Sequence, residues 1–311
     1  MRVHFDGVNF SSTSGPNSFA TRLAKALFNL GHEVLLDYNG ADVSLVFIER
    51  SGRELAKTVV QRLDGIWFSP TNYHTHNHRI KALWNSANGV IYQSQFDKTF
   101  IEKCWDVHKN SAIISNGVEI QPVTKFTIPA LEQLRQQYKL IFCCAANWHG
   151  QKRLGANIHM FKHIRKTIEP SSCLIVLGDN AQVVSDVGIF YAGSQPHDVC
   201  AQIYSASNWM LHLAWLDHCP NVVVEALSQS TPVICPSDGG TKELIKNFGV
   251  VISEAHPYDF SLVDYDTPPY IDVTQLKALP TKTELGEAPD VDINNVAKLY
   301  VAHLQKCVNT V

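Results

Sequence analysis

Short apolar runs alternate along the chain with longer stretches in which apolar residues recur at helical spacing. In the first part, the apolar runs that predict strands lie at residues 2–7, 33–38, 42–48, 65–70, 89–94 and 111–117. The stretches between them predict helices near residues 16–31, 51–62, 77–86 and 94–104. Strands that alternate with helices indicate parallel βαβ units and a doubly wound sheet.

The alternation stops at residues 116–130, where turn residues and two prolines predict a linker, and then starts again. Further strands are predicted at residues 139–146, 173–179, 189–193, 209–214, 232–237 and 249–254. Helices are predicted at residues 152–168, 196–206, from 220 onward and 291–307, and an irregular segment at 254–290. The pattern predicts an α/β protein with two Rossmann-like, doubly wound parallel-sheet domains in tandem.

Composition narrows the function classes. A chain of 311 residues has the length of two domains, and its net charge of −3 lacks the basic character of a nucleic-acid-binding protein. No apolar run approaches the roughly 18 residues that span a bilayer, so there is no strong membrane signal. The first residues lack the pattern of a signal peptide, and we expect a cytoplasmic protein.

The cysteines and histidines do not form a metal-binding motif. None of the eight cysteines belongs to a CxxC pair, and several lie in apolar runs, so we expect reduced, buried thiols. His74, His76 and His78 occupy alternate positions, which would place them on one face of a strand. No further ligand motif accompanies them, and we expect no metal site.

The stretch DHCPNVVVEALS, residues 217–228, places one carboxylate in an apolar helix that follows a predicted strand. A carboxylate buried there needs a partner, which could be ligand hydroxyls or a Lys or Arg across a helix interface. The helix start near Asn221 and Val222 offers backbone N–H groups to an anion. Ligands of open α/β sheets bind at this end of the strands, so Glu225 becomes a candidate binding residue.

This stretch resembles the donor-site motif of retaining GT-B glycosyltransferases of family GT4, in which two acidic residues stand at E-x7-E spacing. Asp217 matches the first position, where the family usually has glutamate, and Glu225 matches the second. The resemblance implies that Glu225 holds the ribose hydroxyls of the donor. It also implies that Asp217 lies beside the transferred sugar.

The segment CCAANWHGQKRL is similar to the family segment whose arginine and lysine neutralise the donor diphosphate. Lys152 matches the lysine, while Asn147 stands where the arginine is usual. Arg153 could supply the missing charge. Downstream, Gly239 and Gly240 match glycines that allow a close backbone approach.

Two segments of the first half resemble the acceptor side of the family. Gly15 lies in a small-residue loop, SGPN, that is similar to the family loop approaching the sugar phosphate. Many members carry a histidine near WFSPTNYHTHNHRI that touches the sugar or the acceptor. His74 is the first candidate for it and His76 the second, and surface histidines are the alternative.

The resemblance implies a GT-B fold whose domains face a central cleft: residues 1–120 with helix 291–311 on the acceptor side, and residues 121–290 on the donor side. The expected reaction is retaining, metal-independent transfer of a hexosyl group from a UDP- or GDP-linked donor to a hydroxyl of a glycan, small molecule or protein. The nucleotide sugar is then a co-substrate, and no cofactor is expected.

Other functions remain as alternatives. A catalytically silent GT-B relative or a sugar-nucleotide binding protein would fit the departures at Asp217 and Asn147. A nucleotide-sugar epimerase of GT-B shape would need no acceptor. A nicotinamide dehydrogenase is disfavoured because neither half has GxGxxG after its first strand.

Overall fold

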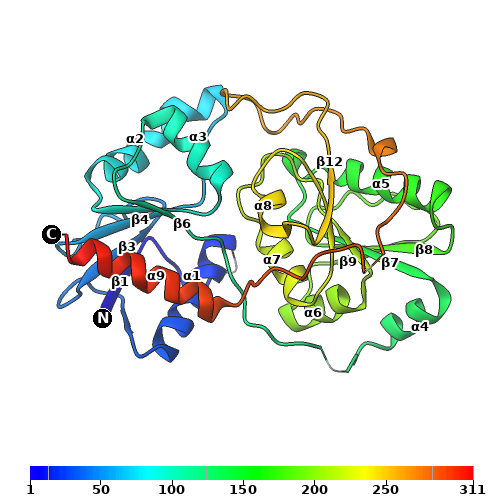
Figure 1. Cartoon of the computed structure of the whole chain (residues 1–311), viewed down its shortest axis with the longest axis horizontal. Coiled ribbons are helices and arrows are strands. Elements are labelled where there is room, and N and C mark those ends of the chain that lie inside the picture. Colours follow the sequence, from blue (N-terminus) through cyan, green and yellow to red (C-terminus); the bar gives the residue numbers. More distant parts are fainter. Residues whose placement is uncertain (13, 124, 282, 311) are drawn as a thin grey trace. The chain divides into compact units, whose positions relative to one another are not determined.

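The computed structural model describes residues 1–12, 14–123, 125–281 and 283–310. The chain divides into two compact units, each with its own parallel sheet (Figure 1). Unit 1 consists of Met1–Glu119, Phe260–Asp264 and Val291–Val311, and unit 2 consists of Ile120–Asp259 and Tyr265–Asp290. The predicted pair of parallel α/β sheets is confirmed.

The sheet of unit 1 has six parallel strands in the order β2-β1-β3-β4-β5-β6. They are β1 (Arg2–Asp6), β2 (Glu33–Leu35), β3 (Val43–Phe47), β4 (Val59–Leu63), β5 (Gly89–Tyr92) and β6 (Ser111–Ile113). The chain runs from β1 to β2 on one side and then to β3 on the other. The order therefore reverses between β1 and β3, which is the place where ligands bind in flavodoxin-like sheets.

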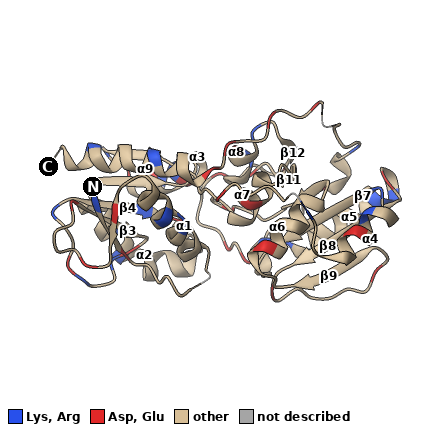
Figure 2. Ribbon diagram, turned by 90° about the horizontal axis from the view of Figure 1, so that it is seen from below, with Lys and Arg blue, Asp and Glu red and all other residues tan. Residues whose placement is uncertain are grey.

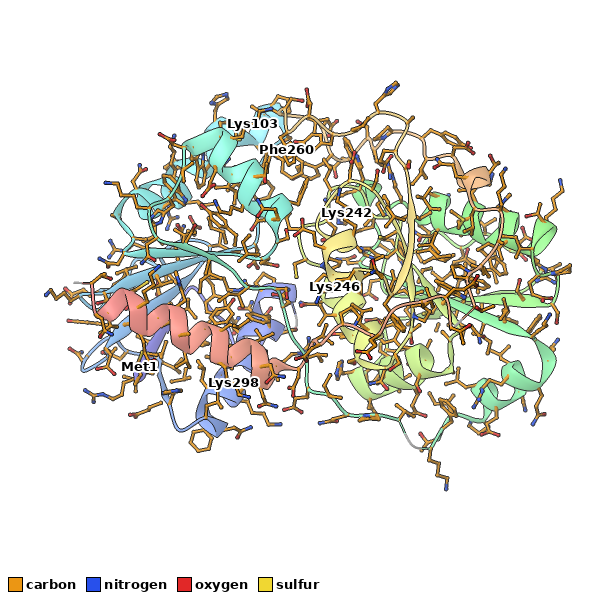
Figure 3. All side chains as sticks on the ribbon, viewed as in Figure 1. Met1, Lys103, Lys242, Lys246, Phe260 and Lys298 are labelled. Atoms are coloured by element: carbon orange, nitrogen blue, oxygen red, sulfur yellow. The ribbon has the colours of Figure 1, made fainter. Side chains whose placement is uncertain are left out.

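The helices of unit 1 are α1 (Gly15–Asn29), α2 (Pro70–Ser86), α3 (Gln95–Trp105) and α9 (Ile293–Val308). Helix α9 packs beside α1, and Phe19, Tyr300 and Leu304 are fully buried in one core (Figure 1). The segment Phe260–Asp264 packs on α3, where the ring of Phe260 lies 5.5 Å from that of Phe96 (Figure 3).

Two predicted elements of unit 1 are wrong. Residues 51–62 were expected to be helical, but the last of them belong to strand β4. Its polar side chains are buried and form hydrogen bonds, so they do not mark an exposed helix face. Gln61 donates to the carbonyls of Ile48 and Ile80, and Arg62 donates to the side chains of Tyr300 and Asn116. Residues 65–70 do not form the predicted strand, since α2 begins at Pro70 after the Ser69 cap.

The sheet of unit 2 also has six parallel strands, in the order β12-β11-β10-β7-β8-β9. They are β7 (Leu140–Ala145), β8 (Ser172–Leu177), β9 (Ile189–Gly193), β10 (Trp209–Leu211), β11 (Val233–Pro236) and β12 (Gly249–Ile252). From β7 the chain first adds β8 and β9 on one side, and then adds β10, β11 and β12 on the other side. The order reverses between β7 and β10, as in a Rossmann sheet.

The helices of unit 2 are α4 (Pro129–Gln137), α5 (Leu154–Thr167), α6 (His197–Ala206), α7 (Asn221–Ser228) and α8 (Thr241–Ile245), with 3-10 turns at Gly150–Lys152 and Val273–Gln275. Helix α4 begins within the predicted linker. Residues 265–276 pack against α5, where His163 Nε2 lies 2.8 Å from the carbonyl oxygen of Leu276. Ile271, Val273 and Leu276 are buried in the core of this unit.

Charged residues of both signs are distributed along the described parts of the chain. Lys and Arg are interspersed with Asp and Glu over both units in Figure 2. Within the described ranges, no helix is both long and apolar enough to cross a bilayer.

Buried His303 on α9 should make the stability of the protein depend on pH. His303 is 7% exposed, and burial, reinforced by the charge of Lys306 and by His108, lowers its pKa to about 4. Its ordinary pKa of about 6.5 applies to the unfolded chain. The folded state therefore binds fewer protons, and stability falls by up to about 3 kcal/mol as the pH drops from 6.5 to 4.

We expect His303→Gln to reduce the decrease in the free energy of unfolding between pH 7.5 and pH 5, measured by urea unfolding at pH 7.5, 6 and 5. The substitution of the exposed residue His74→Gln serves as the matched control. Equal pH slopes for the parent protein and the His303 variant would contradict the assignment.

Candidate functional site

The candidate site of unit 2 lies where the sheet order reverses. Strands β7 and β10 are parallel neighbours, and the chain continues from their carboxyl ends in loops on opposite sides of this point. The loop after β7 carries Lys152, and the loop after β10 carries Asp217. The N–H of Trp215 donates to the carbonyl of Gln151 at 2.9 Å and ties the two loops together. Two charged side chains are thus held at the place where open α/β sheets bind ligands.

Lys152 and Asp217 form an ion pair. The Nζ of Lys152 donates to Oδ2 of Asp217 at 2.5 Å, and the two side chains are 23% and 13% exposed. Nε2 of buried His212 lies 3.4 Å from the same carboxylate oxygen. Burial acts to raise the pKa of Asp217, but the charges and hydrogen bonds of Lys152 and His212 outweigh it and lower the pKa well below its usual range. Asp217 is therefore a carboxylate across the physiological pH range.

Gly239 and Gly240 support the Asp217 loop. The N–H of Gly240 donates to the carbonyl of Asp217 at 2.7 Å. Gly239 has φ +107°, and a Cβ atom there would lie 2.9 Å from the carbonyl oxygen of Asp217. A side chain at position 239 would therefore displace the loop, which explains the residue type from the packing of the backbone alone.

Helix α7 starts directly after the Asp217 loop. It begins at Asn221, followed by Val222, and the carbonyl of Pro220 accepts from the N–H groups of Val223 and Val224 at 3.1 and 3.2 Å. Glu225 lies in its second turn with a side chain that is 13% exposed, and its Oε1 lies 3.9 Å from Nδ1 of His197 on α6. A half-exposed histidine is thus one neighbour of the Glu225 carboxylate.

Arg153 differs from the adjacent Lys152 because its charge is already compensated. Its side chain is 3% exposed, and its two terminal nitrogens donate to the two carboxylate oxygens of Glu254 at 2.6 and 3.2 Å. It also donates to the carbonyl of Pro269 at 2.7 Å. This geometry argues against the predicted contact of Arg153 with a diphosphate, since both terminal nitrogens of its guanidinium are engaged by Glu254 and Pro269. Arg153 instead connects Glu254, just after β12, to Pro269.

Asn147 lies beside a small pocket at the ends of β7 and β8. Its Oδ1 accepts from Nδ2 of Asn180 at 2.7 Å. The pocket has a volume of about 220 Å³, and Trp148, His149 and Asn180 are among its lining residues. Sequence reasoning did not single out Trp148, whose indole N–H donates to the carbonyl of Leu177 at 2.8 Å.

In unit 1 the candidate histidines lie on helix α2, not on a strand. Three residues that alternate along a helix point to different sides, so the expected common face does not exist. His74 is exposed, with its ring 5.1 Å from that of Tyr73, whereas His76 lies 5.0 Å from the ring of Trp67. Gly15 is the first residue of α1.

Among the residues that the structure describes, no group of three or more His, Cys, Asp or Glu side chains is arranged to hold a metal ion. The Lys152 ammonium is a cationic group at the site in unit 2.

Comparison with known proteins identifies the fold. No protein-family model matches the chain, and no curated protein matches its sequence. Solved structures do match over the whole chain. HepE of Anabaena, in complex with UDP-glucose, has a TM-score of 0.63 at 14% identity and covers 100% of this chain and 99% of its own.

Two further structures agree. Sucrose-phosphate synthase of Thermosynechococcus elongatus has a TM-score of 0.64 at 13% identity, covering 100% and 98%. A glycosyltransferase of Rickettsia africae has a TM-score of 0.65 at 12% identity, covering 100% and 99%. These similar structures are GT-B glycosyltransferases, and the protein has the GT-B fold.

Proposed function

We propose that the protein is a retaining glycosyltransferase that transfers a hexosyl group from a nucleotide-diphosphate sugar to an acceptor hydroxyl. The observation that carries this proposal is the Lys152–Asp217 pair at the β7/β10 reversal of a GT-B fold. The acidic pair Asp217 and Glu225 at E-x7-E-like spacing favours family GT4 and retention. Because HepE is similar in structure and was solved with UDP-glucose and with UDP, we favour a UDP-linked donor over a GDP-linked one.

The proposed roles follow from charge and position. Lys152 and the start of α7 at Asn221 and Val222 neutralise the diphosphate, most strongly as charge develops on the departing group. Glu225 accepts hydrogen bonds from the ribose hydroxyls, and Asp217 orients the sugar. An ammonium and a helix terminus offset part of the diphosphate charge, and we propose that no metal ion takes part.

The test is calorimetric titration with UDP, GDP, ADP and pyrophosphate, with magnesium and with EDTA. We expect UDP to bind most tightly and equally in both buffers. Glu225→Gln should lower the affinity for UDP about tenfold, because one charged hydrogen bond contributes roughly 1.5–3 kcal/mol. The affinity for pyrophosphate should not change, because pyrophosphate has no ribose. Glu132→Gln, on the exposed face of α4, is the matched control.

Failure of every nucleoside diphosphate to bind would overturn the proposal in favour of a silent GT-B relative. The reaction itself is followed by proton NMR of the UDP-sugar. Slow hydrolysis of an α-linked donor should first release the α-anomer. A β-anomer would exclude retention, and an epimerised donor without hydrolysis would identify an epimerase.

A further inference from the structure

Unit 1 has a pocket at its own reversal of strand order. The pocket has a volume of about 730 Å³ and lies at the carboxyl ends of β1 and β3. Gly7 and residues 47–51 form one side of it. Trp67 and residues of α2, including His76 and Arg79, form the other side. Its position is the one where a flavodoxin-like sheet binds its ligand.

The backbone of this pocket adopts positive φ at two positions, and at one of them, Ile48, the conformation costs energy. Ile48, a β-branched residue, has φ +66°, which is rare for its type. Its N–H donates to the carbonyl of Arg62 at 2.8 Å, and its carbonyl accepts from Gln61 at 2.6 Å. At Gly7, φ is +76° and a Cβ atom would lie 2.6 Å from the carbonyl oxygen of Phe47. Strained backbone that is fixed by surrounding hydrogen bonds is typical of binding sites.

A buried carboxylate fixes the loop after β3. Asp6, at the end of β1, is 2% exposed. It accepts hydrogen bonds from the N–H of Ser51, at 2.9 Å, and from the Ser51 hydroxyl. The loop that carries Glu49 and Arg50 is therefore held at both ends, and the pocket is pre-formed.

The lining combines an aromatic surface with an excess of positive charge. Trp67 is 43% exposed although it is one of the largest apolar side chains, and the ring of His76 lies 5.0 Å from it. Arg79 Nε lies 3.4 Å from Oε2 of Glu49, with both side chains about half exposed. Arg50 donates only to the carbonyl of Arg53, at 3.1 Å, among the contacts described. Arg79 also donates to the backbone carbonyl of Arg50 at 3.1 Å. The lining thus contains two arginines and one glutamate.

We propose that this pocket binds a sugar that carries a carboxylate or phosphate group, and that this acidic sugar is the acceptor of the transferase. The face of the sugar ring would stack on Trp67, since aromatic rings present large apolar area with little entropic cost. Arg50 and Arg79 would hold the anionic group, because guanidinium groups match carboxylate and phosphate geometry. The role as acceptor rests on the proposed function, whereas the binding of an acidic sugar does not.

The test titrates the full chain with glucose 6-phosphate, glucuronate, glucose and inorganic phosphate, followed by tryptophan fluorescence and calorimetry. We expect the two acidic sugars to bind at least about tenfold more tightly than glucose or phosphate alone. Trp67→Ala should weaken both acidic sugars about tenfold, and Arg79→Gln should abolish the preference over glucose. Tyr270→Ala, an exposed aromatic residue in unit 2, is the matched control.

The other possible results of these titrations each contradict a particular part of the inference or of the proposed function. If glucose binds as tightly as the acidic sugars, the pocket does not require an anionic group. If inorganic phosphate binds as tightly as they do, the pocket does not recognise the sugar ring. Binding of UDP without any acidic sugar would overturn this inference and leave the proposed function standing. If the protein binds acidic sugars but no nucleotide, the inference about the pocket stands and the proposed transferase function is contradicted. Both pocket variants should keep the parent affinity for UDP.

Discussion

Replacement of Lys152 by methionine is expected to lower the affinity for UDP about 100-fold and to leave the affinity for uridine unchanged. Two effects add. The diphosphate loses a charge-assisted hydrogen bond, worth roughly 1.5–3 kcal/mol. Asp217 loses the ammonium 2.5 Å away that compensates its charge, so its carboxylate repels the phosphates. Calorimetry with UDP, UMP and uridine separates phosphate binding from nucleoside binding.

The second effect gives this prediction its control. Adding Asp217→Asn to the Lys152→Met variant removes the repulsion, so part of the UDP affinity should return. Lys139→Met tests for a general effect of lost charge, since Lys139 belongs to the same unit and pairs with Glu169 on an exposed surface. If UDP and uridine lose affinity to the same extent, Lys152 does not contact the diphosphate.

Replacement of Arg153 by methionine is expected to destabilise the protein by about 3–5 kcal/mol, the usual cost of removing one partner from a buried ion pair. Glu254 is 6% exposed and would be left without its bidentate partner, and Pro269 would lose a donor. Methionine keeps the length of the side chain. Arg153 has φ +51°, which methionine tolerates about as well as arginine does, so the change isolates the charge. Urea unfolding followed by circular dichroism measures the loss.

Restoring neutrality should recover the stability. The double variant Arg153→Met with Glu254→Gln should regain at least half of the loss, whereas Arg135→Met on exposed α4 should change little. A stable Arg153→Met protein that has lost UDP binding would reverse the assignment. Arg153 would then be a diphosphate ligand, as the sequence alone suggested.

These two adjacent cations show where sequence reasoning succeeds and where it stops. The position of the Lys152–Arg153 segment at the end of a strand followed from local alternation of apolar and helical stretches. Arg153 differs from Lys152 because it pairs with Glu254, about 100 residues away, and no local sequence pattern connects Glu254 to Arg153. Nothing in residues 147–153 predicts which cation is already satisfied.

Unit 1 was harder to predict, for a related reason. The strand β4 contains Gln61 and Arg62, whose polar side chains are fully buried by partners from distant segments. Polar residues weakened the strand pattern, and the element after it was misplaced. The histidines of α2 were then placed on a strand, and Trp67, at the start of that region, was not recognised as a lining residue.

The return of α9 to the first unit has a consequence for synthesis on the ribosome. The core around Phe19 needs Tyr300 and Leu304, which are translated after all of residues 120–290. At 5–20 residues per second, those residues take roughly ten to thirty seconds to make. During that interval the nascent first unit exposes the apolar face that α9 later covers, so it is the part of the chain most in need of a chaperone. The second unit can complete its own sheet earlier, and folding then proceeds against the order of translation.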